Sequence, residues 1–449
     1  MEKSLKVEKS QDDLGAGRKW IVLILASIGS SIIYYVPYLS GIFYDPVIQA
    51  LNITNTQLGL LFSAYAISAM ICYIPSGIVA DKIRMRTLSG VGFISTALLV
   101  LGFALLPPFE ICLVIYAGLG VTTILIWWGV RFKLVRLIYK EEEYPKRIGI
   151  SYGLYGAAGL VFGLLAAGIV GLVANNMGLA FSYVLLVNGL VLLVLGVLSF
   201  IFIPKFKEEI KSESALDLSG FVSALKNPVV WLAALSVFFV YWFSQGVAYT
   251  TPYLTAVLGA SLIMTTVVAT IRQYGVGVLS APIFGFIADK FKPSKVVAIG
   301  SIAFAVCALA LRFLPTTAAI VIIAAVLVIV LGFLGTGTFG IVSGQLTEGR
   351  VPVHYFGAAT GLLSIIGYLP DVFFRTWFGS IMDAGTDAAG VVAASAFQQI
   401  FVILIIVAIL AAATSFALFF YVTKRNARLA AKEISLATEA TNLAAEATI

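Results

Sequence analysis

The chain has 449 residues, of which 60% are hydrophobic and 11% are charged. Its mean hydropathy of +1.02 excludes a soluble globular protein, because soluble domains carry about 25% charged residues. Apolar runs of about 20 residues recur, each long enough to cross a bilayer core of about 30 Å. The composition predicts a polytopic all-α membrane protein and not a barrel, whose strands are short and alternate in polarity.

The net charge of +7 does not indicate nucleic-acid binding, because the basic residues occur in alternate loops. Of the 29 Lys and Arg, 26 fall in the two tails and in loops on one side of the predicted bundle. The other three, Arg272, Arg312 and Arg375, lie in apolar runs. Basic loops mark the cytoplasmic side. We therefore expect a multi-pass protein of the cell inner membrane with both termini in the cytoplasm, lipid around it and no nucleic-acid partner.

The apolar runs predict twelve transmembrane helices in two groups of six. The predicted spans are 20–43, 57–79, 87–107, 110–131, 150–173, 179–203, 229–251, 263–288, 296–314, 318–343, 356–381 and 396–422. A polar segment separates the groups. The predicted domains are a cytoplasmic N-tail (1–19), an N-terminal six-helix bundle (20–203), a cytoplasmic linker (204–228), a C-terminal six-helix bundle (229–422) and a cytoplasmic C-tail (423–449).

Two stretches of the sequence repeat at about half the chain length. Residues 77–84 and 285–292 share Gly, Ala, Asp and Lys at the same spacing, and their offset is 208 residues. Gly149 and Gly153, at the start of the fifth span, recur as Gly357 and Gly361 in the eleventh at the same offset. The repeat predicts duplicated halves.

The repeated Gly-x-x-x-Asp-Arg/Lys turn resembles the signature of the major facilitator superfamily. The resemblance covers the whole membrane region and implies two pseudo-symmetric six-helix halves that alternate access to a central site by rocking. It assigns a gating role, with no substrate contact, to Gly77, Asp81, Lys82, Arg86, Gly285, Asp289 and Lys290. The first copy departs from the family pattern. Arg84 replaces a second Gly and Met85 replaces a basic residue, so this turn is expected to be less tight.

The fifth span lacks the Gly-Pro pair of the family's antiporter signature, which weakens a drug-antiporter interpretation. The arginine in the eighth span and the Tyr-rich first span resemble bacterial carriers of small organic or inorganic anions. That narrower resemblance implies an anionic substrate.

Three charged residues lie deep in predicted spans, where a charge costs about 2.5–3.5 kcal/mol. Arg272 lies about 20 Å from the turn at Gly285, and Asp371 about 21 Å from Gly357, at 1.5 Å of rise per residue. Arg375 is one turn beyond Asp371 on the same face.

Three hypotheses explain these charges. In the first hypothesis, Asp371 forms an internal salt bridge with Arg272 or with Arg375. Alternatively, the two arginines leave one positive charge for a carboxylate or phosphate. In the third hypothesis, Asp371 takes up a proton and couples transport.

Polar aromatic residues cluster in the first and seventh spans, which line the central cavity in the family that the chain resembles. Tyr34, Tyr35, Tyr241 and Gln245 are therefore candidates for substrate contacts. The alternative is an interfacial belt of Tyr and Trp, which suits Tyr38 and Tyr249 better.

Other charges near predicted span ends have simpler interpretations. Arg131, Lys133 and Arg312 are expected to snorkel to the interface. Asp45 and Glu110 are expected to be solvated at the outer ends.

Catalytic and cofactor motifs are not found. The single His, His354, lies in a loop, the three Cys lie in apolar runs, and there is no phosphate-binding loop. We expect a monomeric secondary transporter with no enzyme activity, cofactor or metal. Its predicted substrate is a small organic anion (a carboxylate, sugar acid or phosphate ester), with proton symport or exchange against a counter-substrate. A neutral sugar or drug transporter of the same fold and a transport-inactive membrane sensor are the alternatives.

Overall fold

The computed structural model describes residues 8–173, 175–207, 209–210 and 218–446. Twelve of its helical segments are long and apolar enough to cross a membrane, which confirms the predicted all-α polytopic class. The described residues form no β-strand, and their only β pairings are two isolated bridges, Lys9 with Phe206 and Thr386 with Val392.

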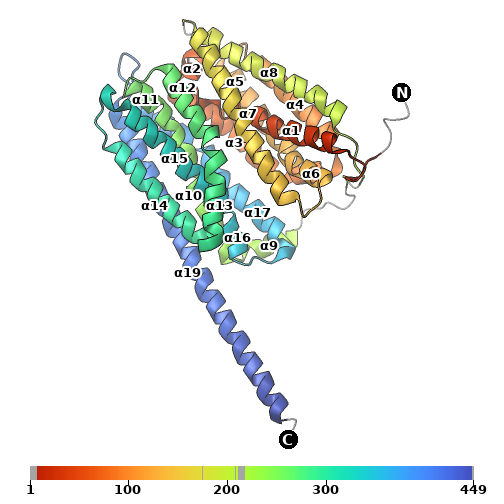
Figure 1. Cartoon of the computed structure of the whole chain (residues 1–449). Helices are drawn as coiled ribbons and strands as arrows, with labels where there is room; N and C mark the ends of the chain where they lie inside the picture. The colour runs from red at the N-terminus through yellow and green to blue at the C-terminus, as the bar shows by residue number, and fades with distance from the viewer. Residues whose placement is uncertain (1–7, 174, 208, 211–217, 447–449) are drawn as a thin grey trace.

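The first six spans form one half of the molecule, drawn red to yellow in Figure 1. Within it, α4 packs against α8, α3 against α5, and α1 against α7. Its elements are α1 (Ala16–Ile33), η2 (Leu39–Gly41), α2 (Tyr44–Leu51), α3 (Asn55–Lys82), α4 (Met85–Phe103), α5 (Phe109–Gly120), η3 (Val121–Trp127), α6 (Trp128–Ile138), α7 (Tyr144–Leu172) and α8 (Met177–Phe202).

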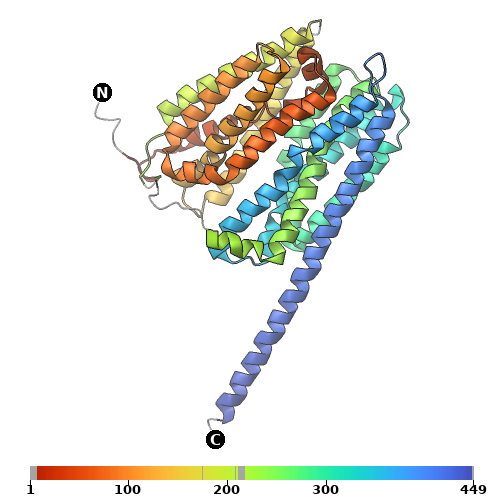
Figure 2. The same cartoon turned by 180° about the vertical axis from the view of Figure 1, so that it is seen from behind.

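The last six spans form the other half, drawn green to blue. Here α19 packs against α14 and α10, and α10 packs against α17. The elements are α9 (Leu218–Leu225), α10 (Pro228–Gly246), η4 (Val247–Tyr249), α11 (Thr250–Ala256), α12 (Leu262–Thr270), η5 (Ile271–Gly275), α13 (Gly277–Phe291), α14 (Pro293–Arg312), η6 (Ala318–Ile320), α15 (Val321–Val342), α16 (Gly344–Glu348), α17 (Val353–Tyr368), η7 (Leu369–Val372), α18 (Phe374–Ala384) and α19 (Ala394–Glu446). Beyond the bundle, α19 continues as one helix (Figure 2).

Several spans are interrupted where polar residues occur. A π-helical turn, a feature frequent at functional sites, interrupts the fourth span at η3 and the eighth at η5. The eleventh span breaks at the 3₁₀ turn η7. The first span ends at Ile33 and not at residue 43 as predicted, because Pro37 lacks an N–H and disfavours a helical residue before it.

The two ends of the bundle differ in how the halves meet. We call the end where α1 begins and α8 ends the terminal side, and the end that carries α2 and α11 the distal side. In Figure 1 the two halves lie against each other at α2, α11 and α12 and diverge toward α6, α9 and α17. Close contact on the distal side requires glycine. A Cβ on Gly59 would lie 2.6 Å from the Arg375 carbonyl oxygen, and one on Gly379 would lie 2.3 Å from the Asn55 carbonyl oxygen.

Asp383 holds the two halves together on the distal side. Its carboxylate accepts hydrogen bonds from the N–H and Nδ2 of Asn55, at 2.9 and 2.8 Å, and from the N–H and Oγ1 of Thr56, at 2.8 and 2.5 Å. Asn55 begins α3, whose first N–H groups have no partner within the helix and whose dipole favours a negative charge. The carboxylate at the end of α18 therefore stabilises α3 from the other half.

The other hydrogen bonds between the halves lie toward the same end. They join Tyr44 to Met382, Asp45 to Thr255, Gly41 to Thr251 and Arg272, Ser63 to Thr376, and Tyr38 to Tyr241. Leaving the linker aside, no hydrogen bond or ion pair between described residues joins the halves on the terminal side. The structure is thus closed on the distal side and parted on the terminal side.

Replacing Asp383 by Ala is expected to open the distal side. Each hydrogen bond to a charged group contributes about 1.5–3 kcal/mol, and 1.4 kcal/mol corresponds to a tenfold change in population. In a background without the native cysteines, we place Leu58→Cys at the closed interface, where Leu58 is buried. A maleimide that does not cross membranes should label this cysteine at least about tenfold faster in Asp383→Ala.

Asp387→Ala is the matched control, because among the described residues the Asp387 carboxylate accepts only from the nearby N–H groups of Ala389 and Val391. Equal labelling rates in the Asp383 and Asp387 variants would show that Asp383 does not hold the distal side closed.

Candidate substrate and gating site

The buried charge cluster of the second half is built from one turn of chain. Asp371 lies in η7, and Arg375 lies one turn later in α18. Both side chains are buried, with Arg375 Nε 3.7 Å from Asp371 Oδ1. The Tyr241 hydroxyl from α10 donates to Asp371 Oδ2. Of the two predicted pairs, the structure brings together Asp371 and Arg375.

Arg375 also contacts the first half. Its guanidinium carbon lies 3.9 Å from the centroid of the Phe62 ring, a cation–π contact that stabilises a positive charge. Its Nη2 is 3.5 Å from Gln245 Oε1, and the Tyr249 hydroxyl donates to its carbonyl oxygen at 3.0 Å. Arg375 and Tyr44 line a small cavity near the distal side.

Arg272 lies apart from Asp371, at the same predicted depth but with a different partner. Its Nη2 donates to the carbonyl oxygen of Gly41 in the first half. The side chain is buried, and its Nε has no partner among the described residues. Gly332 leaves room for it, since a Cβ there would lie 2.5 Å from Arg272 Cγ. In this conformation, the hydrogen bond of Arg272 to Gly41 joins the two halves on the closed distal side.

The predicted tyrosines fall into two groups. The Tyr34 hydroxyl donates to the Thr123 carbonyl at 3.0 Å, and the Tyr38 hydroxyl lies 3.4 Å from the Tyr241 hydroxyl of the other half. Tyr35 instead packs on Phe162 and Tyr274, with ring centroids 4.6 and 6.2 Å away. Tyr38, which suited a lipid-interface belt, therefore lies between the halves.

Aromatic side chains connect the two halves in a row that we call the aromatic wall, made of Trp128, Tyr73, Tyr368 and Tyr241. Successive ring centroids are 5.4, 5.5 and 4.7 Å apart. Tyr73 and Tyr368 belong to different halves and stack on each other. Neither residue is singled out by the sequence alone, because a Tyr in the middle of an apolar span has no spacing signal that distinguishes a site residue from a packing residue.

Two basic residues at the end of the fourth span do not snorkel, in contrast to the expectation. Arg131 is buried, with its Nε donating to Ser151 Oγ at 3.1 Å. Lys133 Nζ donates to the Ala80 carbonyl and to Asp81, both at 2.7 Å. The reason is packing: α6 contacts α1, α3 and α7, so this face points into the first half and away from lipid.

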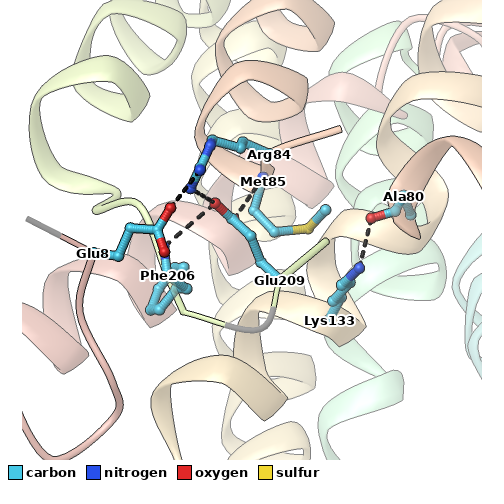
Figure 3. A network of polar contacts seen from close by, with 7 residues as sticks. All are labelled: Glu8, Ala80, Arg84, Met85, Lys133, Phe206 and Glu209. Atoms are coloured by element: carbon cyan, nitrogen blue, oxygen red, sulfur yellow. Dashed lines mark hydrogen bonds and ion pairs between the residues drawn. The ribbon is translucent and has the colours of Figure 1, made fainter. Parts of the chain in front are cut away.

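The first gating stretch contacts its own half, the N-tail and the linker (Figure 3). Asp81 pairs with Lys133. Arg84, at the departure from the family pattern, pairs with Glu8 of the N-tail and at 2.9 Å with Glu209 of the linker. The buried Glu209 also accepts from the Met85 N–H, which begins α4. Arg84 therefore ties the N-tail and the linker to the start of α4.

The second gating stretch lacks these contacts. Asp289 and Lys290 are exposed, and Asp289 has no hydrogen bond or ion pair among the described residues. The start of α14 is capped by Glu348, which accepts from the Ser294 N–H at 2.8 Å. Of the other predicted gating residues, Lys82 is exposed, Arg86 is half-buried, and Gly77 and Gly285 have open space where a Cβ would lie.

Asp45 is expected to make closure of the distal side depend on pH. It is half-buried and accepts from Thr255 Oγ1 at 2.6 Å across the halves, in contrast to the solvated position expected. Burial raises the pKa of its carboxyl, and the Thr255 hydrogen bond lowers that pKa by less. Opening exposes Asp45 to water and returns its pKa toward about 3.9.

The closed state thus binds the proton more tightly than the open state. The closed state is therefore increasingly stabilised as pH falls through the raised pKa of Asp45, and this stabilisation is complete below the ordinary pKa of the open state. Labelling of Leu58→Cys, measured relative to an exposed cysteine, should slow as pH falls. This pH dependence should vanish in Asp45→Asn and persist in Glu110→Gln, which changes an exposed carboxyl at the distal end. The same pH dependence in Asp45→Asn would contradict the assignment.

Comparison with known proteins finds one matching family and several related membrane proteins. A sequence model described as the Major Facilitator Superfamily matches residues 20–374. The inner membrane protein YqcE of Escherichia coli (strain K12) is 27% identical over 410 residues, covering 90% of this chain and 95% of that protein. The inner membrane protein YihN of the same organism is 26% identical over 381 residues, 83% and 90% of the two chains.

Solved structures share the fold. A bacterial homolog of the human lysosomal transporter Spinster, in an inward-facing and unoccupied conformation, aligns with a TM-score of 0.75 at 15% identity, covering 92% of this chain and 99% of the other. The nucleoside transporter NupG aligns with a TM-score of 0.68 at 15% identity, covering 90% and 99%.

Proposed function

The chain belongs to the Major Facilitator Superfamily and is a multi-pass inner-membrane transporter of small solutes, and we propose that its substrate is a small organic anion. The observation that carries this proposal is the charge balance between the halves. Arg131, Arg272 and Arg375 are buried in spanning segments, and Asp371 is the only buried carboxylate of the described spans. An anion would neutralise the excess positive charge, which is costly in a membrane.

The orientation that we propose places the terminal side in the cytoplasm, because the Lys and Arg of the tails and loops gather there. The structure then represents an inward-open state, with the outside closed by Asp383 and by the Tyr38–Tyr241 contact. Substrate would enter between the parted halves and meet the aromatic wall.

Asp371 is our candidate for proton coupling. One of its oxygens accepts from Tyr241. The other, Oδ1, lies 3.7 Å from Arg375 Nε and has no hydrogen bond among the described residues. Protonation would weaken the pairing with Arg375 and leave that arginine for the substrate. Anion binding and proton binding would thus be linked through one arginine.

Uptake into proteoliposomes tests the proposed function. We expect uptake of glucuronate or glucose 6-phosphate, with glucose as the neutral analogue. Arg375→Gln and Arg272→Gln should each reduce anion uptake at least about tenfold, since a charge-assisted hydrogen bond to a carboxylate or phosphate contributes about 1.5–3 kcal/mol. Asp371→Asn should keep exchange but lose its dependence on a proton gradient.

Arg350→Gln is the control for these variants, because Arg350 is exposed on the terminal side. Glucose uptake without anion uptake would contradict the anionic substrate and favour the neutral alternative. Binding without any uptake would favour a transport-inactive sensor.

A further inference from the structure

Arg131 is a buried cation to which no described residue supplies a counter-charge. It is 7% exposed, and its buried Nη2 has no hydrogen-bond partner in the part of the chain that the structure describes. Among the described residues no carboxylate lies within ion-pair distance of it. The guanidinium contacts the Ser151 hydroxyl and three aromatic rings. The centroids of Tyr152, Tyr155 and Phe132 lie 4.2, 5.4 and 5.9 Å from the guanidinium carbon.

These contacts do not replace an anion. A cation–π contact contributes about 0.5–2 kcal/mol. The arrangement also leaves the Nη2 donor without a described partner, and an unsatisfied buried donor costs about 1–3 kcal/mol. Lys133, two residues later, shows that a basic residue of α6 can find a carboxylate, namely Asp81. Arg131 makes no such pair with any described carboxylate.

The position of Arg131 connects it with the aromatic wall. Trp128, at one end of the wall, precedes Arg131 by three residues in α6 and so lies on the same helix face. The ring of Tyr155, which contacts Arg131, also lies near Tyr274 of the other half, with the two ring centroids 6.1 Å apart. The opposite end of the wall is Tyr241, which binds Asp371. Arg131 therefore lies on the terminal side of the wall, and the Asp371–Arg375 pair lies at its distal end.

The three buried arginines differ in what remains available to a ligand. Arg375 is paired with Asp371, and Arg272 donates to the Gly41 carbonyl. Arg131 alone among them lacks both a carboxylate and a partner on the other half within the described structure. Tyr152 covers its guanidinium, and with 53% of its surface exposed this ring can rotate away on a fast timescale.

We infer that Arg131, Ser151 and Tyr152 form an anion-recognition site in the first half, which takes the carboxylate or phosphate group of the substrate. The inference rests on the proposed function and adds a residue that contacts the substrate first on the parted side. In the empty site, Tyr152 covers the guanidinium. When an anion arrives, Tyr152 moves aside and the free N–H of Arg131 donates to the anion's oxygen.

The test is the thermal stability of the purified full-length protein in detergent with glucuronate, glucose 6-phosphate or glucose at constant ionic strength. Each variant is compared with its own anion-free Tm. We expect the anions to raise the Tm of the wild type, Arg131→Gln to lose this increase, and Arg131→Lys to keep part of it. Arg136→Gln, on the same helix but largely exposed, should respond as the wild type does.

Tyr152→Ala gives a second readout that does not depend on the recovery of Arg131→Gln. Removing the covering ring should lower the anion concentration for the half-maximal Tm increase by about threefold or more. If Arg131 only anchors α7 through Ser151, Arg131→Gln should lower the anion-free Tm but leave the anion response unchanged. Tyr152→Ala should then have no effect. Those results would overturn the inference while leaving the proposed function intact. A wild type that responds to glucose and to neither anion would contradict the proposed function itself.

Discussion

Positive charge buried within the membrane is the constraint around which the interior of this protein is arranged. Each guanidinium of Arg131, Arg272 and Arg375 costs free energy in the bilayer, and each is compensated differently. Arg375 contacts a carboxylate and the face of an aromatic ring, and Arg272 donates to a backbone carbonyl. Arg131 contacts a hydroxyl and three aromatic rings. The surplus of positive charge among these described groups is what an anionic substrate would neutralise.

The compensation is coupled to the arrangement of the halves. Arg272 donates a hydrogen bond to the Gly41 carbonyl of the first half, and the Arg375 guanidinium stacks on the Phe62 ring of that half. Both contacts cross the interface that Asp383 holds together. Rocking the halves apart on the distal side would separate both arginines from these contacts in the first half. This links the electrostatics of the site to alternating access, because a bound anion could take the place of the lost contacts.

The sequence was sufficient for the class of fold because span length, basic loops and the 208-residue repeat are one-dimensional signals. It also placed Asp371 and Arg375 one turn apart on a common face, which the structure preserves. It did not separate Arg272 from Asp371, because helical rise gives depth and not direction around the helix axis. Arg131 was missed for a related reason: its closeness to a span end suggested snorkelling, whereas the packing of α6 against α1 and α7 turns it inward. The roles of Tyr73 and Tyr368 depend on contact between the halves, which no local pattern encodes.

Double electron–electron resonance in lipid nanodiscs can measure the distance between the terminal ends of the two halves, and so whether an anion closes the terminal side. Spin labels at Lys82→Cys and Lys290→Cys, both exposed positions, report the separation of the two gating stretches. We expect a long distance without ligand, a population with a shorter distance when glucuronate or glucose 6-phosphate is added, and no change with glucose. A distance distribution that neither anion alters, or that glucose shortens, would contradict an anion-driven closure of the terminal side.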